Sequence, residues 1–307
     1  MPNLTRQASA AMSAAVAIPG QLEHLRNLMD YALGVGNKFF VSSLTGASTN
    51  DGKSSSTPVA TIAQAVAKCQ SAKGDRIYVM PGHSETVTTP IVVNLNNIAI
   101  IGMGEPGECV VTTTTADINL MDITGNGVLI ENLMFTNTGT LTTQTEMIDV
   151  DASYVTIRNC IFSFAATDKA EGINLATGYT LNRVIGCKFI LPDAGESCIL
   201  WASSNTEIAY CDFDLSAGEG VAIAQLATPG NGIRIHDNVF AADGTVTPMI
   251  SWEAAPGAGG AVYNNRVFDC DGDVDVFGDD TDLDTWFSGN FHGSTAGAEV
   301  AINPSVS

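Results

Sequence analysis

A six-residue frame of the form apolar-x-x-x-x-Phe recurs along the second half of this 307-residue chain. Successive frames are separated by 24 or 27 residues. The frames begin at Ile130, Ile157, Val184, Ile208, Ile235, Val262 and Trp286. A second short alternating segment precedes most frames, and Gly, Asn, Asp or Pro separates the segments. Each repeat is therefore predicted to contain several short strands joined by tight turns.

The near-constant step predicts that successive copies stack as the coils of a solenoid, with paired strands about 4.8 Å apart. Each residue then lies over its counterpart in the neighbouring coil. The last frame position predicts a buried aromatic ladder, which Val267 interrupts. Its members are Phe135, Phe162, Phe189, Phe213, Phe240 and Phe291.

Three cysteines occupy the fourth frame position, where later copies carry asparagine. Cys160, Cys187 and Cys211 are followed there by Asn238 and Asn265. The chain holds seven cysteines, an odd number, and no CxxC pair. This pattern favours small buried groups in the core over a disulfide framework or a zinc site.

The I-x-N-N/C-x-F frame resembles the repeat of the pectate-lyase-like superfamily, over roughly residues 75 to 300. Upstream, the segment FFVSSLTGASTNDGKSSSTPVATIAQAVAKCQSAKGDRIYVMPGHSET is similar to the first coil of many phage and bacterial β-helix proteins. The resemblance implies an all-β chain folded as a right-handed parallel β-helix solenoid. It also implies a capping helix from about Val59 to Lys68, which would cover the open end of the stack.

Three segments are predicted: a helical leader at 1–36, a first strand and capping helix at 37–75, and the parallel β-helix at 76–307. In the leader, Leu22, Leu25 and Met29 recur at helical spacing. An amphipathic helix with nothing of its own to cover suggests an oligomerisation or docking contact. A helix folded against its own β-helix remains the alternative.

The chain is acidic, with a formal net charge of −20, and only 15% of its residues are charged. We expect no nucleic-acid partner, because binding nucleic acid needs clustered Lys and Arg. No stretch approaches the roughly 18 apolar residues of a membrane-spanning helix, so no membrane partner is expected.

Asp122, Asp149 and Asp151 are the candidate catalytic residues, because they are predicted to form an outward acidic strip on adjacent coils. Pectate lyases of the resembling superfamily carry calcium-binding Asp residues on one sheet face, with an Arg base nearby. However, their Trp-Ile-Asp-His and Arg-x-Pro-x-x-Arg motifs are absent here. A glycosidase needs two suitably spaced carboxylates, and no pair is singled out by the sequence.

The densest acidic segment, DCDGDVDVFGDDTDLD, spans residues 269–284. Asp269, Asp271, Asp273 and Asp275 have the oxygen-rich spacing that a calcium ion uses, without the order of an EF-hand. The alternative is a solvated, Gly-turned loop. Ca²⁺ is thus a candidate ligand, and no cofactor is required.

A regular solenoid, a phage-like first coil, a short leader and the lack of a catalytic motif together favour a non-catalytic protein of a bacteriophage virion. A capsid decoration protein or a short spike is expected, assembled in the host cytoplasm and exposed on the particle. By analogy, we expect a homotrimer that contacts capsid or tail proteins, with a cell-surface glycan as a further candidate partner. Two alternatives are a polysaccharide-degrading enzyme of the tailspike or lyase type and a secreted bacterial adhesin.

Overall fold

The computed structural model describes residues 36–115, 117–137, 145–164, 170–190, 197–215, 221–226, 230–242, 249–252, 259–268, 285–293 and 299–301. The chain divides into two units, Met1–Gly36 and Asn37–Ser307. Everything described below belongs to the second unit. The predicted leader contacts Leu22, Leu25 and Met29 lie outside the described residues.

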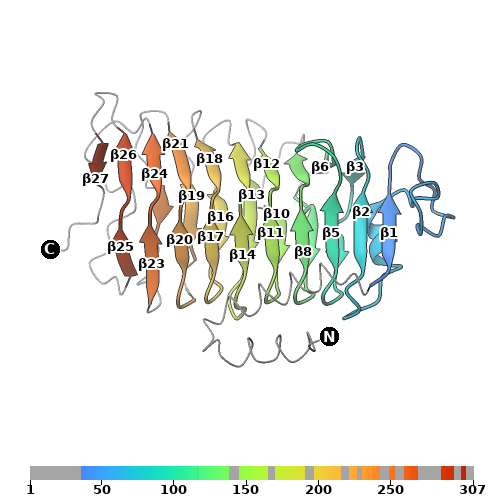
Figure 1. The fold of residues 1–307 in the computed structure, drawn as a ribbon, viewed down its shortest axis with the longest axis horizontal. Coiled ribbons are helices and arrows are strands. Elements are labelled where there is room, and N and C mark those ends of the chain that lie inside the picture. Colours follow the sequence, from blue (N-terminus) through green and yellow to red (C-terminus); the bar gives the residue numbers. More distant parts are fainter. Residues whose placement is uncertain are drawn as a thin grey trace, which may run out of the picture. The chain divides into compact units, whose positions relative to one another are not determined.

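The second unit is a stack of coils whose strands form three sheets (Figure 1). Sheet A holds β1 (Lys38–Val41), β2 (Arg76–Val79), β5 (Ala99–Gly102), β8 (Leu129–Glu131), β11 (Thr156–Arg158), β14 (Arg183–Ile185), β17 (Glu207–Ala209), β20 (Arg234–His236), β23 (Gly260–Tyr263) and β25 (Thr285–Ser288). Sheet B holds β3 (Ser84–Val87), β6 (Val110–Thr113), β9 (Met134–Asn137), β12 (Ile161–Ser163), β15 (Lys188–Ile190), β18 (Asp212–Leu215), β21 (Val239–Ala242), β24 (Arg266–Phe268), β26 (Phe291–Gly293) and β27 (Glu299–Ala301). Sheet C holds β4 (Ile91–Val93), β7 (Met121–Ile123), β10 (Thr145–Val150), β13 (Ala170–Leu175), β16 (Ser197–Trp201), β19 (Val221–Gln225) and β22 (Ile250–Ser251).

Strands pair in parallel between successive coils, except that β26 and β27 pair antiparallel. The first frame position forms one continuous row in sheet A, in which Ile130 pairs with Ile157 and Ile157 with Val184. The row extends upstream to Ile100 and then Ile77. These side chains are fully buried, so the repeat seen in the sequence is the core of the stack.

The aromatic ladder fills the core beneath sheet B. Phe162 and Phe189 stack with ring centroids 4.9 Å apart and planes 10° from parallel. Phe189 stacks on Phe213 at 4.9 Å, and Phe213 on Phe240 at 4.9 Å. Phe135 continues the row upstream at 5.3 Å from Phe162. Each such aromatic pair stabilises the fold by about 0.5–1.5 kcal/mol beyond the contribution of the buried apolar area.

The predicted ladder is wrong at its last member, Phe291. In sheet B, Val267 pairs with His292, whereas Phe291 pairs with Arg266. Phe291 is 41% exposed. The frame is therefore displaced by one residue in the last coil.

Sheet A shows the same displacement, because Val262 pairs with Phe287 and not with Trp286. Buried asparagines explain this register. Asn265 donates its backbone N–H to Asn290 Oδ1 at 3.0 Å and its side-chain amide to the same oxygen at 3.1 Å. Asn290 thus takes the fourth frame position and moves the rest of the frame with it.

The fourth frame position is a buried polar row. Asn238 donates its side-chain amide to Asn265 Oδ1 at 3.0 Å and to Ile208 O at 3.1 Å. Upstream, the Cys211 thiol donates to Val184 O at 3.6 Å. Burial raises the pKa of the Cys187 thiol well above its ordinary value. The six cysteines that the structure describes are all free.

Helix α3 (Ile62–Val66) lies at the N-terminal end of the stack and is shorter than the predicted span of 59–68. The chain before it is extended, since Val59 bridges Val41. Thr61 caps the helix by accepting from Gln64 N at 3.2 Å. The buried Glu85 carboxylate accepts the Ile62 N–H at 2.8 Å, which anchors the helix to the first coil.

Candidate functional site

The predicted acidic strip lies on the outward face of sheet C. Asp122 in β7 and Asp149 in β10 are register partners, and both alternate with buried residues. Asp122 Oδ1 accepts a hydrogen bond from Asn119 Nδ2 at 2.9 Å, and Asp149 Oδ1 accepts one from Asn174 Nδ2 at 2.9 Å. Asp151 is exposed and follows the end of β10. The structure therefore brings the three predicted carboxylates to one side of two adjacent coils.

Asp149 is the most perturbed carboxyl of this strip. Burial, followed by the charges of Asp151 and Glu146, raises the pKa of Asp149 to about 6, and the Asn174 hydrogen bond only partly opposes them. Burial also raises the pKa of Glu146. A carboxyl that titrates near neutral pH beside other carboxylates has the properties of a general acid or base.

No group of three or more His, Cys, Asp or Glu side chains in the described part of the chain is arranged to hold a metal ion. The calcium candidates Asp269, Asp271, Asp273 and Asp275 lie outside the described residues. The calcium hypothesis therefore stays a prediction.

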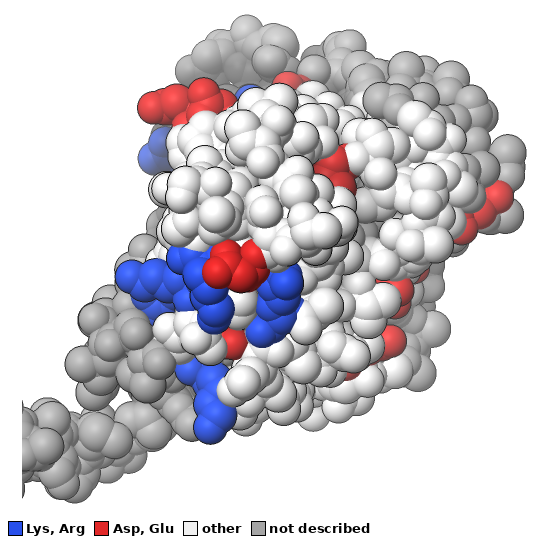
Figure 2. Space-filling view, turned by 90° about the vertical axis from the view of Figure 1, so that its right-hand side faces the viewer, with Lys and Arg blue, Asp and Glu red and all other residues white. Residues whose placement is uncertain are grey.

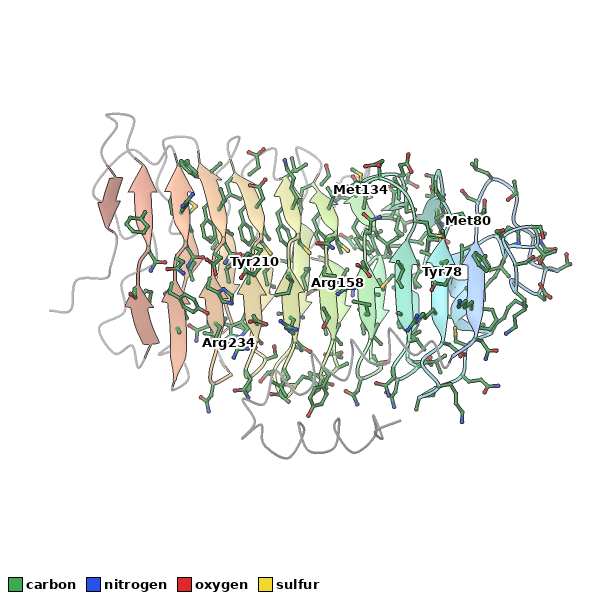
Figure 3. The ribbon with its side chains drawn as sticks, in the orientation of Figure 1. Tyr78, Met80, Met134, Arg158, Tyr210 and Arg234 are labelled. Atoms are coloured by element: carbon green, nitrogen blue, oxygen red, sulfur yellow. The ribbon has the colours of Figure 1, made fainter. Side chains whose placement is uncertain are left out.

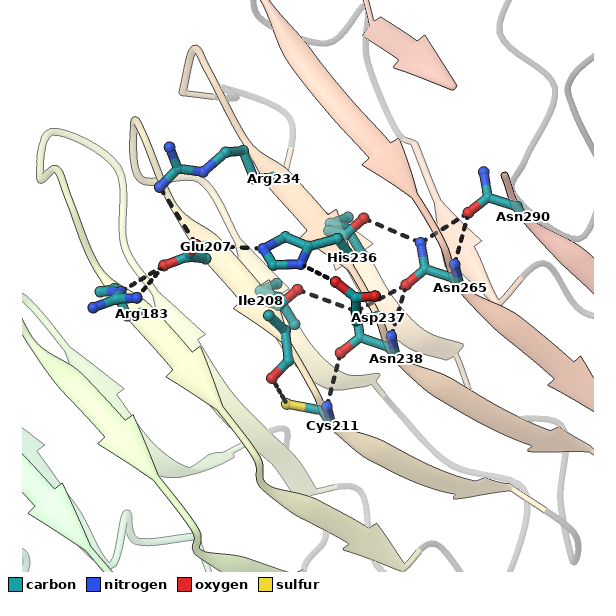
Figure 4. A network of polar contacts seen from close by, with 12 residues as sticks. Arg183, Glu207, Ile208, Cys211, Arg234, His236, Asp237, Asn238, Asn265 and Asn290 are labelled. Carbon is teal, nitrogen blue, oxygen red and sulfur yellow. Dashed lines mark hydrogen bonds and ion pairs between the residues drawn. The ribbon is translucent and has the colours of Figure 1, made fainter. Parts of the chain in front are cut away.

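A second polar cluster, which sequence reasoning missed, lies on the outward face of sheet A (Figure 4). Arg183, Glu207 and Arg234 are register partners on β14, β17 and β20. Glu207 Oε2 accepts from Arg183 Nε at 2.6 Å, and Glu207 Oε1 lies 3.7 Å from Arg234. Imidazole Nε2 of His236 lies 3.3 Å from the same Oε1 atom, and its Nδ1 lies 2.8 Å from Asp237 Oδ2.

The surroundings of Glu207 and His236 favour the charged form of both side chains. The hydrogen bond with His236 and the charges of both arginines outweigh burial and lower the pKa of Glu207 to about 2. Burial opposes a charged His236, but the hydrogen bonds with Glu207 and Asp237 outweigh it and raise the pKa of His236.

Aromatic rings flank the cluster. The Tyr263 ring stacks on His236 with centroids 4.7 Å apart, and the Tyr210 ring meets His236 edge-on at 5.7 Å. Tyr210 is 63% exposed and adopts a left-handed backbone with φ of 57°. Tyr210 and Arg234 lie on neighbouring coils (Figure 3). This face combines a fixed network of charges with an exposed aromatic ring.

The sequence did contain a signal for this cluster. Arg183, Glu207 and Arg234 each stand immediately before the first apolar residue of their frame. Parallel stacking in register therefore places them side by side. The same reasoning applies at the second frame position, where Arg158 Nη2 donates to Glu131 Oε2 at 2.9 Å. Comparing like frame positions for opposite charges would have found both sets of contacts.

The family described as "Right handed beta helix region" matches residues 94–291. The chain belongs to this family. The predicted right-handed parallel β-helix is thereby confirmed, and the three stacked sheets agree with it. No helix in the described ranges is long and apolar enough to span a bilayer.

Among solved structures, the chain is similar to a pectin methylesterase from Aspergillus niger, with a TM-score of 0.57 and 13% identity over 88% of this chain and 92% of that one. A mutant pectin methylesterase in complex with a hexasaccharide gives 0.50 and 12% over 87% and 91%. A mutant tailspike protein of E. coli bacteriophage HK620 in complex with a pentasaccharide gives 0.42 and 11% over 73% and 48%. No curated protein sequence matches. Likenesses at this identity show the fold alone.

Proposed function

We propose that this chain is a non-catalytic structural protein of a bacteriophage virion, either a capsid decoration protein or a short spike. In this proposal three copies associate and the leader docks to capsid or tail proteins. The β-helix then projects from the particle surface. The protein is assembled in the host cytoplasm and acts on the finished particle.

The observation that carries the proposal is the unbroken parallel pairing of the coils. Parallel pairing in sheet A runs from β1 through to β25. Each coil adds main-chain hydrogen bonds and buried rows to its neighbours without needing a separate globular core. Such a stack suits a rigid projection that must resist unfolding outside the cell. The net charge of −20 keeps neighbouring projections apart in solution.

The test is to purify phage particles from the host that carries this gene and to probe gradient fractions with an antibody against the recombinant chain. We expect the chain to sediment with the capsid proteins at a fixed stoichiometry that is a multiple of three. Recovery only in particle-free fractions would contradict a virion role.

A second candidate function is cleavage of a polysaccharide at the strip of Asp122 and Asp149. The specific observation in its favour is the pKa of Asp149, raised to about 6, next to a second carboxyl on the adjacent strand. Strands in register lie about 4.8 Å apart, which is compatible with a pair of cooperating carboxylates. Incubation with a panel of bacterial surface polysaccharides tests this function. Release of oligosaccharides that Asp149→Asn abolishes would establish it, whereas equal product from wild type and variant would exclude this strip as the site.

A further inference from the structure

Positive charge is concentrated at one end of this acidic chain. Residues 37–76 contain five of the 13 Lys and Arg residues but only two acidic ones. Residues 77–157 then contain nine acidic residues and neither Lys nor Arg. The charge therefore changes sign between the first turn of the β-helix and the coils that follow.

The folded chain gathers these basic residues at the N-terminal end of the stack. Lys38 in β1 and Arg76 in β2 are register partners. Lys53 Nζ donates to Asn37 Oδ1 at 3.0 Å and lies 4.0 Å from the centre of the Phe39 ring, over the first coil. Figure 2, which looks onto this end, shows Lys and Arg side chains gathered on one part of it, with a small acidic area among them. Lys38, Lys53, Lys68 and Lys73 are all exposed.

The two acidic residues of this segment do little to offset that charge. Asp75 is fully buried, where its carboxylate accepts from Asn37 N at 2.6 Å and Gln70 N at 2.7 Å. Asp51 is exposed, and hydrogen bonds from Lys53 N and the Thr57 hydroxyl lower its pKa. Four exposed lysines thus face solvent with one exposed carboxylate between them.

We propose that this basic end, defined by Lys38, Lys53, Lys68, Lys73 and Arg76, is a docking surface for an acidic protein surface. The inference rests on the proposed virion function for the identity of that partner, which would be the capsid or tail protein beneath the β-helix. An acidic partner attracts this end and repels the acid-only coils behind it. The charge distribution therefore orients the stack end-on, with the basic end toward the partner.

Charge complementarity favours a protein over a nucleic acid as the occupant. An extended nucleic acid would also contact residues 77–157, which contain nine acidic residues and neither Lys nor Arg. These carboxylates would repel its phosphates. A protein that binds the N-terminal end of the stack contacts only this basic end. Four of the five basic residues are lysine, whereas arginine is the side chain that best matches phosphate.

The experiment measures binding of the full chain to immobilised poly-L-glutamate at low salt. The end variant is Lys68→Gln with Lys73→Gln, and the control is Lys188→Gln with Arg266→Gln, which changes the net charge equally on distant coils. Exposed ion pairs contribute up to about 1 kcal/mol each, so the end variant is expected to bind roughly tenfold more weakly. The control is expected to stay within about twofold of wild type.

Equal binding by the two variants overturns the inference. Tighter binding of wild type to duplex DNA than to poly-L-glutamate overturns it in favour of a nucleic acid. Self-association that the end variant abolishes overturns it in favour of a second copy of the chain. In particle preparations, an end variant that is incorporated as well as the control refutes the docking surface while the virion function stands. Absence from particles, with poly-L-glutamate binding still lost in the end variant, refutes the virion function while the acidic-partner surface stands.

Discussion

Thiol and amide side chains fill equivalent buried positions in this stack. Cys211 and Asn238 stand in adjacent coils at the fourth frame position, and Asn238 Oδ1 accepts the Cys211 N–H at 2.9 Å. Both side chains also donate to a carbonyl of a neighbouring coil. The amide makes more hydrogen bonds than the thiol, so its loss leaves more buried groups unpaired.

Replacing Asn265 by alanine is the sharpest test at this position. Asn265 Oδ1 accepts the Asn238 N–H at 3.1 Å, and its amide donates to Ile235 O at 3.0 Å. Since the site is fully buried, we expect Asn265→Ala to lower the free energy of unfolding by about 2–4 kcal/mol. Chemical denaturation measures this. The exposed Asn96→Ala serves as a control, and similar losses in both variants would contradict the argument.

Asp149 predicts a stability change with pH. Its pKa is raised from 3.8 to about 6, so the folded state holds a proton that the unfolded state releases, and stability falls as pH rises through this window. Asp149→Asn removes that penalty while Asn174 can still donate to the new amide oxygen. After allowance for solvent screening, we expect a gain of about 1 kcal/mol at pH 7.5 and none at pH 3.5. Melting curves at the two pH values measure the difference, and a gain independent of pH would contradict it.

Glu207 predicts the opposite dependence at acid pH. Its pKa is lowered from 4.5 to about 2, so its stabilising contribution is present above about 4.5 and is lost as pH falls toward 2. His236, whose pKa is raised above 6.5, contributes below 6.5 and loses its contribution at higher pH. Glu207→Gln should therefore destabilise most between about pH 4.5 and 6.5. Thermal unfolding of both proteins across pH 2–8 checks this, and a constant difference would be inconsistent with it.

Sequence reasoning located the acidic strip but missed the Arg183–Glu207–His236 cluster, for a physical reason. Asp122 and Asp149 lie in short alternating strands, so their outward direction follows from the period of two alone. The cluster draws on a cross-coil row and on His236, which lies two residues beyond Arg234 in β20. The frame places the two arginines beside Glu207, whereas the contact with His236 and the pKa shifts cannot be deduced without the structure.

At the scale of the element, the strands are too short to be stable alone and owe their order to the rows that join them. Each of β11, β12, β14 and β15 has three residues. One central side chain in each strand faces the core. An aromatic ring at that position therefore supports its own coil and both neighbouring coils.

Phe189 and Phe291 form a matched pair of test sites. Phe189→Asp places a charge in the fully buried ladder and should abolish soluble folding, because an isolated buried carboxylate costs several kcal/mol. Phe291, at 41% exposure, should tolerate the same change with a loss of less than about 1 kcal/mol. Soluble yield and circular dichroism distinguish the two. A normal fold for Phe189→Asp would refute the ladder.

The repeating frame predicted the strand register correctly up to the last coil, where two alignments of the frame are possible. In the last coil, WFSGNF offers both Trp286 and Phe287 as the first position. Hydrophobicity alone does not choose between them. The asparagine row does, because the buried Asn265 amide needs Asn290 as its partner. A similar limit applies to α3, whose predicted start lay in chain that is extended at Val59.

At the scale of the whole molecule, the leader and the β-helix are separate units. We also assign trimer formation to the leader, in which Leu22, Leu25 and Met29 recur at helical spacing. Light scattering should therefore give a trimer for the full chain and a monomer for a chain that starts at Asn37. A monomer in both cases would weaken the virion proposal and direct attention to the polysaccharides. Calcium chelation during the same measurement tests the candidates near Asp271.

The in-register stacking of the coils also bears on how chains of this kind change in length. Ile130, Ile157 and Val184 follow one another at 27 residues and pair in register. Removing or duplicating one such interval in the gene would again set like residues on like, with the same turns between them. Length can therefore vary by whole coils, each adding about 4.8 Å. The 24-residue step from Val184 to Ile208 keeps the same register, so the turns accept small changes in length, whereas a residue inserted within a strand would displace every row that the strand joins.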